Sequence, residues 1–174
     1  MKTDHIDVRN HLSANKISYL YHFTDRRNLD SIRRYGGLYS WKYCLDHNII
    51  IAFPGGNDDS RNNDRRYQLE DYVRLSFCDD HPMKKRLLDS GYDLVLLKIK
   101  TDVAELETTL FSDINATDNN CIFGGSIENL KAVDFYATQC HFLKNSDPLF
   151  KKHQAEVLVK TFIPIDKIVN IDSL

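Results

Sequence analysis

Short segments in which apolar and polar residues alternate recur along the chain, and they constrain the fold more than any other feature. Such alternation is typical of half-buried strands. It predicts strands at residues 18–23, 72–77, 93–100 and 155–162. The most apolar of these, DLVLLKIK, is expected in the centre of a sheet. Short helices are predicted between the strands, at residues 24–35, 82–88 and 126–131. Together these patterns predict a single α+β domain over residues 1–174.

Other stretches of the chain show no such periodicity. Residues 54–71 and 113–125 are rich in Asn, Asp, Gly and charged side chains, which predicts two polar loops. Loops of that length in compact domains usually carry function. Of two short apolar stretches, residues 48–53 are expected to form a strand or a buried turn of chain, and residues 133–136 an extended segment. The two polar loops are therefore candidate sites of recognition.

The charge balance argues against a protein that coats duplex DNA. The chain has 23 Lys and Arg against 25 Asp and Glu, a formal net charge of −2, whereas duplex-coating proteins are usually basic. No apolar run approaches the ~20 residues that a membrane helix needs. The first residues are also too polar for a secretory signal peptide. We therefore expect a cytoplasmic protein.

No metal site is expected from the sequence. The 4 cysteines are widely spaced and form no CxxC pair. Asp79, Asp80 and His81 are consecutive, and consecutive side chains do not all converge on one ion. The sequence also lacks a G-x-S-x-G elbow, a P-loop and an H-E-x-x-H motif. Common templates for hydrolase, nucleotide triphosphatase and zinc-protease chemistry are thus absent.

Two positions combine polar side chains with otherwise buried strands. His22 ends a predicted strand just before a predicted helix, where backbone N–H groups can meet an anion; the alternative is a structural histidine. In the last strong strand, a period of two places Gln154 and Glu156 on one face. A carboxylate there is costly to desolvate unless it has partners or a function; the alternative is an exposed glutamate on an edge strand.

Four stretches, taken in order, resemble the DarT-type family of NAD-dependent ADP-ribosyltransferase toxins. They are YHFTDRRNLDSIRRYGGLYS, DYVRLSFCDDHPM, FSDINAT and HQAEVLVKTFIP. The pattern Gln154-x-Glu156 also resembles the Q-x-E motif of mono-ADP-ribosyltransferases. The resemblance implies an ADP-ribosyltransferase-like fold, in which split mixed β-sheets form an NAD cleft flanked by short helices. It also implies NAD as co-substrate and no metal.

The resemblance implies roles for individual residues. Glu156 would bind the ribose 2′-OH, stabilise an oxocarbenium-like transition state and act as general base. Gln154 would orient the acceptor, and Arg74 would bind a phosphate of NAD or of the acceptor. The NAD-binding residues would be His22, Phe23, Thr24, Asn28, Ser31, Gly37 and Tyr39. The nucleic-acid-binding residues, all in the two polar loops, would be Arg61, Arg65, Arg66 and Asn115.

The acceptor stays open at this point. Thymidine-type members carry Pro-Phe-Tyr-Phe where this chain has Arg74-Leu75-Ser76-Phe77, so neither the base nor the choice between single-stranded DNA and RNA follows. A nucleobase acceptor would have to be single-stranded or flipped. Alternatives are a protein side chain, an RNA 2′-phosphate, or a non-catalytic nucleotide-binding module. The family resemblance further implies a role in toxicity or phage defence and a cognate antitoxin, such as a macrodomain hydrolase.

Overall fold

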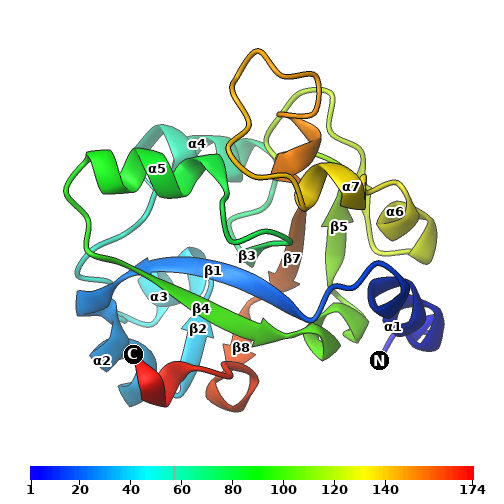
Figure 1. The fold of residues 1–174 in the computed structure, drawn as a ribbon. Coiled ribbons are helices and arrows are strands. Elements are labelled where there is room, and N and C mark those ends of the chain that lie inside the picture. Colours follow the sequence, from blue (N-terminus) through cyan, green and yellow to red (C-terminus); the bar gives the residue numbers. More distant parts are fainter. Residues whose placement is uncertain (57) are drawn as a thin grey trace.

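The computed structural model describes residues 1–56 and 58–174, and its centre is a six-stranded sheet. Its neighbouring strands run antiparallel in the order β4-β1-β3-β7-β5-β6 (Figure 1). Their bounds are β4 (Leu94–Lys100), β1 (Tyr19–Asp25), β3 (Tyr72–Ser76), β7 (Glu156–Lys160), β5 (Leu110–Ser112) and β6 (Phe123–Gly124). A second, two-stranded antiparallel sheet pairs β2 (Gly37–Tyr39) with β8 (Phe162–Pro164). The predicted α+β class is confirmed, and each strand pair among the described residues is antiparallel rather than mixed.

Short helices surround these sheets. In Figure 1, α1 and α6 lie beside β5 at one end of the molecule, while α2 lies at the other end near β2. The α-helices are α1 (His5–Ala14), α2 (Leu29–Arg34), α3 (Trp41–Asp46), α4 (Asp58–Arg66), α5 (Pro82–Asp89), α6 (Ile127–Lys131) and α7 (Phe135–Thr138). The 3₁₀ helices are η1 (Arg26–Asn28), η2 (Thr101–Glu105), η3 (Lys152–Gln154), η4 (Ile165–Lys167) and η5 (Ile171–Ser173).

Alternate residues of the strands form the core. Leu20, Leu75, Leu97 and Val157 are at most 1% exposed, as the period of two requires. Helix α1, which the sequence patterns did not predict, adds Leu12 to this core. Burial of this apolar surface is the main force that holds the sheet together. The packed strands in turn hold the polar side chains that they carry in fixed positions.

Several local predictions were wrong. The segment 54–71 is not a loop throughout, because it contains α4. Residues 48–53 form no strand, and 133–136 enter α7 instead of staying extended. Strand β4 lies at the edge of the main sheet, although Val169 N donates to Lys98 O and Ile168 bridges to Ile99 along its outer side. This added cover explains why an edge strand has the apolar pattern of a central one.

The predicted helix after β1 begins differently from the expectation. Thr24 belongs to β1 and is not the cap. Asp25 caps η1 instead, since its carboxylate accepts a hydrogen bond from Arg27 N. The last predicted strand is also divided, because Thr161 adopts a φ of 62° between β7 and β8. Among the described residues, no helix is long and apolar enough to cross a membrane.

Candidate active site

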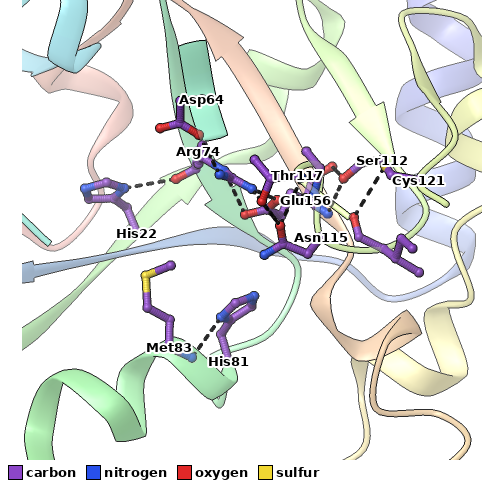
Figure 2. Close-up of polar contacts among 12 residues, drawn as sticks. His22, Asp64, Arg74, His81, Met83, Ser112, Asn115, Thr117, Cys121 and Glu156 are labelled. Carbon is purple, nitrogen blue, oxygen red and sulfur yellow. Dashed lines mark hydrogen bonds and ion pairs between the residues drawn. The ribbon is translucent and has the colours of Figure 1, made fainter. Parts of the chain in front are cut away.

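A cavity of about 240 Å³ opens on one face of the main sheet. Its lining comes from β1, η1, the end of β2, β3, α3, α4, the segment before α4, α5 with the residue before it, and the first residue of β7. A volume of a few hundred Å³ with a small number of polar groups is typical of a small-molecule site. Glu156 is one of the charged residues that line it, and it lies beside Arg74 and Asn115 (Figure 2).

Glu156 is only 4% exposed, and three hydrogen bonds fix its carboxylate. Arg74 Nε donates to Oε1 at 3.1 Å, and Arg74 Nη2 donates to Oε2. The backbone N–H of Ala116 donates to Oε2 at 2.9 Å. A carboxylate has about four acceptor positions, so Oε1 keeps one open position. Glu156 is therefore oriented and paired, yet able to accept one further hydrogen bond.

The register of β3 and β7 explains why these two side chains meet. Arg74 lies opposite Leu158, two residues along the strand from Glu156. Arg74 and Glu156 are thus diagonal neighbours on one face of an antiparallel pair, where long side chains reach one another. The main chain at Glu156 is fixed from the other side, since its N–H donates to Ser112 Oγ of β5 at 3.1 Å.

Arg74 has a second carboxylate partner that the sequence did not suggest. Arg74 Nη1 donates to Asp64 Oδ1 of α4 at 3.0 Å, and Trp41 Nε1 of α3 donates to Asp64 Oδ2 at 3.2 Å. Asp64 is 7% exposed. Asn115 Oδ1 accepts from Arg74 Nη2 at 3.2 Å. The guanidinium is consequently held on three sides by Glu156, Asp64 and Asn115.

Electrostatics in this cluster follow from burial and opposite charge. Burial acts to lower the pKa of Arg74, but attraction to Glu156 and Asp64 outweighs it and raises that pKa, so Arg74 stays charged. Burial raises the pKa of the Asp64 carboxyl; the nearby charge of Glu156 adds to this, whereas Arg74 and Trp41 oppose it. A single guanidinium thus serves two buried carboxylates.

His22 lines the cavity from β1. Its Nδ1 lies 3.0 Å from Arg74 O, and since a carbonyl only accepts, Nδ1 carries the proton. Burial lowers the pKa of His22, so the ring is neutral and its Nε2 is an acceptor. Phe23 and Thr24, next to it in β1, also line the cavity. The predicted residues His22, Phe23 and Thr24 are therefore all located at the cavity.

The remaining residues predicted to bind NAD divide between contact and support. Asn28 lines the cavity, but its amide is occupied: Nδ2 donates to Phe53 O at 2.7 Å and Oδ1 accepts from Phe53 N at 3.1 Å. Ser31 and Gly37 line an adjoining cavity of about 90 Å³, and Tyr39 lines both cavities. A Cβ on Gly37 would lie 2.1 Å from Ile163 O, so glycine there permits the close pairing of β2 with β8.

Of the other predicted site residues, only Arg61 is among those that line the cavity. The expectation that Gln154 shares a strand face with Glu156 is wrong: Gln154 ends η3, and its Nε2 donates to Phe150 O at 3.2 Å. Arg61 lines the cavity from α4, while Arg65 and Arg66 are exposed on that helix. Asn115 contacts Arg74 and so supports the Arg74–Glu156 pair. The proposed contacts of these residues with acceptor and DNA stay predictions.

Sequence reasoning missed Asp64, Trp41 and His81 as members of the site. Trp41 is the sole tryptophan of the chain, which is the one signal that could have singled it out. His81 caps α5, because its Nδ1 accepts from Met83 N at 3.2 Å (Figure 2). Its Nε2 is buried without a hydrogen-bond partner among the described residues. Over the same residues, no group of three or more His, Cys, Asp or Glu side chains could hold a metal ion.

The fold and this site define a class of protein, and comparison with known proteins identifies it as the ADP-ribosyltransferases. A curated DNA ADP-ribosyl transferase from Thermus aquaticus is 30% identical over 173 residues, covering 87% of this chain and 73% of its own. Solved structures of Thermus sp. 2.9 DarT are similar in fold. Its complex with ADP-ribosylated ssDNA superposes with a TM-score of 0.75 at 20% identity, over 88% of this chain and 79% of that one. Its complex with NAD⁺ gives 0.71 at 21%, over 88% and 80%.

Thermosipho africanus DarTG in complex with ADP-ribose matches with a TM-score of 0.74 at 22% identity, over 87% of this chain and 42% of that one. The family described as "ssDNA thymidine ADP-ribosyltransferase, DarT" matches residues 21–173. The chain belongs to this family. The resemblance inferred from the sequence is confirmed, as are the ADP-ribosyltransferase fold and activity. The sequence left the choice of acceptor open, and the family description names single-stranded DNA.

Proposed function

We propose that the chain transfers ADP-ribose from NAD to a base of single-stranded DNA and releases nicotinamide, with Glu156 as the catalytic carboxylate. The observation that carries the proposal is the buried Glu156–Arg74 pair in the cavity of a DarT-family fold. NAD⁺ and ADP-ribosylated ssDNA bound to Thermus sp. 2.9 DarT support the choice of substrates.

The reaction breaks the bond between nicotinamide and ribose C1′. Nicotinamide leaves with the bonding electrons, and the ribose acquires oxocarbenium character. A ring nitrogen of the acceptor base then bonds to C1′ and gives up its proton. The open acceptor position on Glu156 Oε1 suits the ribose 2′-OH, and the negative charge of Glu156 favours the positive charge that develops next to it. Once the base has bonded to C1′, the same open position on Oε1 receives the proton that the base releases.

The walls of the cavity supply complementary groups for NAD. The neutral His22 offers an acceptor at Nε2, and Thr24 offers a hydroxyl beside it. Tyr39 stacks on Tyr43 and on Phe162, with ring centroids 4.7 and 4.3 Å away, so it builds the wall of the cavity instead of offering a free ring face to nicotinamide. Arg61 suits the diphosphate, because a guanidinium pairs well with phosphate oxygens. Asn28, whose amide holds Phe53, contributes by building the wall of the cavity.

Thymidine is the base named in the family description, and it is the acceptor we propose. Thymidine-type members carry proline at the position of Arg74. Because of this difference, the identity of the modified base needs a direct test. Purified protein is incubated with labelled NAD and with single-stranded oligonucleotides that each lack one base. Labelling is expected in every pool except the one without thymidine. If labelling is instead lost only in a pool that lacks another base, the enzyme modifies that base, and Arg74 accompanies a different base specificity.

The proposal extends to the cell. Modified bases block copying of DNA, so the activity is expected to be toxic and to require a cognate antitoxin, for which a macrodomain hydrolase has the appropriate chemistry. It also places the protein in the cytoplasm, where NAD and its DNA substrate occur together. The fold of Thermosipho africanus DarTG supports the search for such a partner. Poor growth on expression of the intact gene, rescued by Glu156→Gln, is the expected result.

The test of Glu156 uses two isosteric variants. Glu156→Gln should lower transfer by at least ~10³-fold, since it removes the charge and the general base. Glu105 is a matched control, because it is 2% exposed and accepts a bidentate pair from Arg9 outside the cavity. Glu105→Gln should lower stability and keep transfer. Near-normal transfer by Glu156→Gln, or equal losses in both variants, would overturn the assignment.

A further inference from the structure

Asp64 is a buried carboxylate in the last turns of α4, and it faces the same guanidinium as Glu156. Ion pairs of Asp64 and Glu156 among the described residues are with Arg74 alone. Arg61, three residues earlier on the helix, lies over the Trp41 ring at 5.9 Å from its centroid. The local cluster therefore contains two carboxylates and one guanidinium, with a formal charge of −1.

That charge matters for the reaction proposed above. A lone Arg74–Glu156 pair would be neutral and would attract a cationic ribose weakly. The second carboxylate shares the positive charge of Arg74, so more of the negative charge of Glu156 stays available to the sugar. Fixed charges of this kind act most strongly in a partly enclosed site, where water screens them less.

Asp64 also fixes which edge of Arg74 faces Glu156. Nη1 points to Asp64, and this leaves Nε and Nη2 for the two oxygens of Glu156 (Figure 2). Asp64 is itself held by the indole N–H of Trp41. The orientation of the Glu156 carboxylate, with its open position on Oε1, thus depends on a contact from α4.

We propose that Asp64 is a positioning residue for catalysis, which holds Arg74 and shares its charge so that Glu156 is oriented and anionic toward the ribose. This inference rests on the proposed function for its effect on the rate. The positioning itself is a property of the protein without substrate, so it can be measured separately.

The kinetic test is Asp64→Asn, which keeps the shape and the Trp41 contact but removes the charge. We expect kcat for ADP-ribose transfer to fall about 10- to 100-fold, with KM for NAD within about threefold of wild type. Asp64→Glu, which keeps the charge, should recover most of the rate. Asp59→Asn is the control, since Asp59 is an exposed acid on the same helix and does not line the cavity.

The structural test follows the side-chain Nε–H signal of Arg74 in ¹⁵N NMR spectra, identified by its loss in Arg74→Lys. Asp64→Asn should shift this signal, and Asp59→Asn should not. If Asp64→Asn does not fold, Asp64→Glu and Asp64→Gln form a pair of equal size that differs in charge, and the same comparison is made between them.

The outcomes separate this proposal from the proposed function. A normal kcat in Asp64→Asn, a loss shared by Asp59→Asn, or a change confined to KM would overturn the positioning role while the wild type still transfers ADP-ribose. A wild type without transfer would overturn the proposed function. The Arg74 signal would then decide the positioning on its own: a shift supports it, and an unchanged signal refutes it.

Discussion

The sheet wall of the cavity, formed by β1, β3 and β7, and its helix wall, formed by α3 and α4, are held in place by different forces. The strands pair through their main chains and bury apolar residues such as Leu75 and Val157. Helix α4 consists of polar and charged residues throughout, and Asp64 is its only buried member. Asp64 contacts the sheet through Arg74 of β3 and contacts α3 through Trp41. The sheet wall is therefore built on main-chain pairing and apolar burial, whereas α4 contacts it through charged groups.

The largest effect that would test this difference is expected at Arg74. Arg74→Met removes the cation between two buried carboxylates and leaves both without an ionic partner. We expect the free energy of unfolding to fall by about 3 kcal/mol or more, as when one partner of a buried pair is removed. Urea denaturation measures it. A double variant that also carries Glu156→Gln should regain part of the loss. If Arg74→Met costs less than about 1 kcal/mol, the cluster does not hold the helix wall to the sheet.

The same difference explains what the sequence could predict. The sheet wall follows from alternation of apolar and polar residues, which correctly located β1, β3 and β7 and, with the family resemblance, led to Arg74 and Glu156. Helix α4 offers no apolar face, so no periodicity distinguishes it from a polar loop. The contact between Asp64 and Arg74 depends on how the chain folds back, which residue spacing does not encode. The prediction for Gln154 was wrong for a related reason. Strand β7 begins only at Glu156, so Gln154 lies outside it, in η3.

A smaller effect on stability is expected from His81. The start of α5 at Pro82 was predicted correctly, but the role of His81 as its cap was not. Burial lowers the pKa of His81 to about 4, and the cap to Met83 N needs Nδ1 unprotonated. The folded pKa lies below the unfolded value of about 6.5, so this contribution to stability is present above pH 6.5. It is lost as the pH falls toward 4.

Urea denaturation at pH 7.5 and pH 5 should therefore differ by about 1 to 2 kcal/mol through this group. His81→Asn is the control, because asparagine also caps helices but does not titrate. Its unfolding free energy should change less between the two pH values. An equal change in His81→Asn and wild type would show that other groups cause the acid sensitivity.

The contact between the two helices of the helix wall should be worth less. Trp41→Phe removes the hydrogen bond to Asp64 and keeps an aromatic ring under Arg65, whose guanidinium lies 4.9 Å from the ring centroid. We expect a loss of about 1 kcal/mol in unfolding free energy, the usual net size for one intramolecular hydrogen bond. Thermal unfolding measures it. A loss above that of Arg74→Met would place the main anchor of α4 at Trp41 instead of at Arg74.

The smallest effect concerns the outer face of α4, where Arg65 and Arg66 are exposed. If they follow the phosphates of single-stranded DNA, replacing both by Gln should weaken binding about two- to fivefold at moderate salt. It should also reduce the slope of log K against log salt by about 1.4, since each single-strand contact contributes about 0.7. Fluorescence anisotropy with a labelled oligonucleotide measures both quantities.

Lys98→Gln with Lys100→Gln is the charge-matched control, because both lysines are exposed on β4, which does not line the cavity. This pair should change the slope little. Equal changes in the two double variants would mean that net charge alone governs binding, and α4 would then serve the catalytic pair through Asp64 without also holding DNA. A change confined to the arginines would give α4 two faces with separate tasks, an inner one that orients Glu156 and an outer one that holds the acceptor strand.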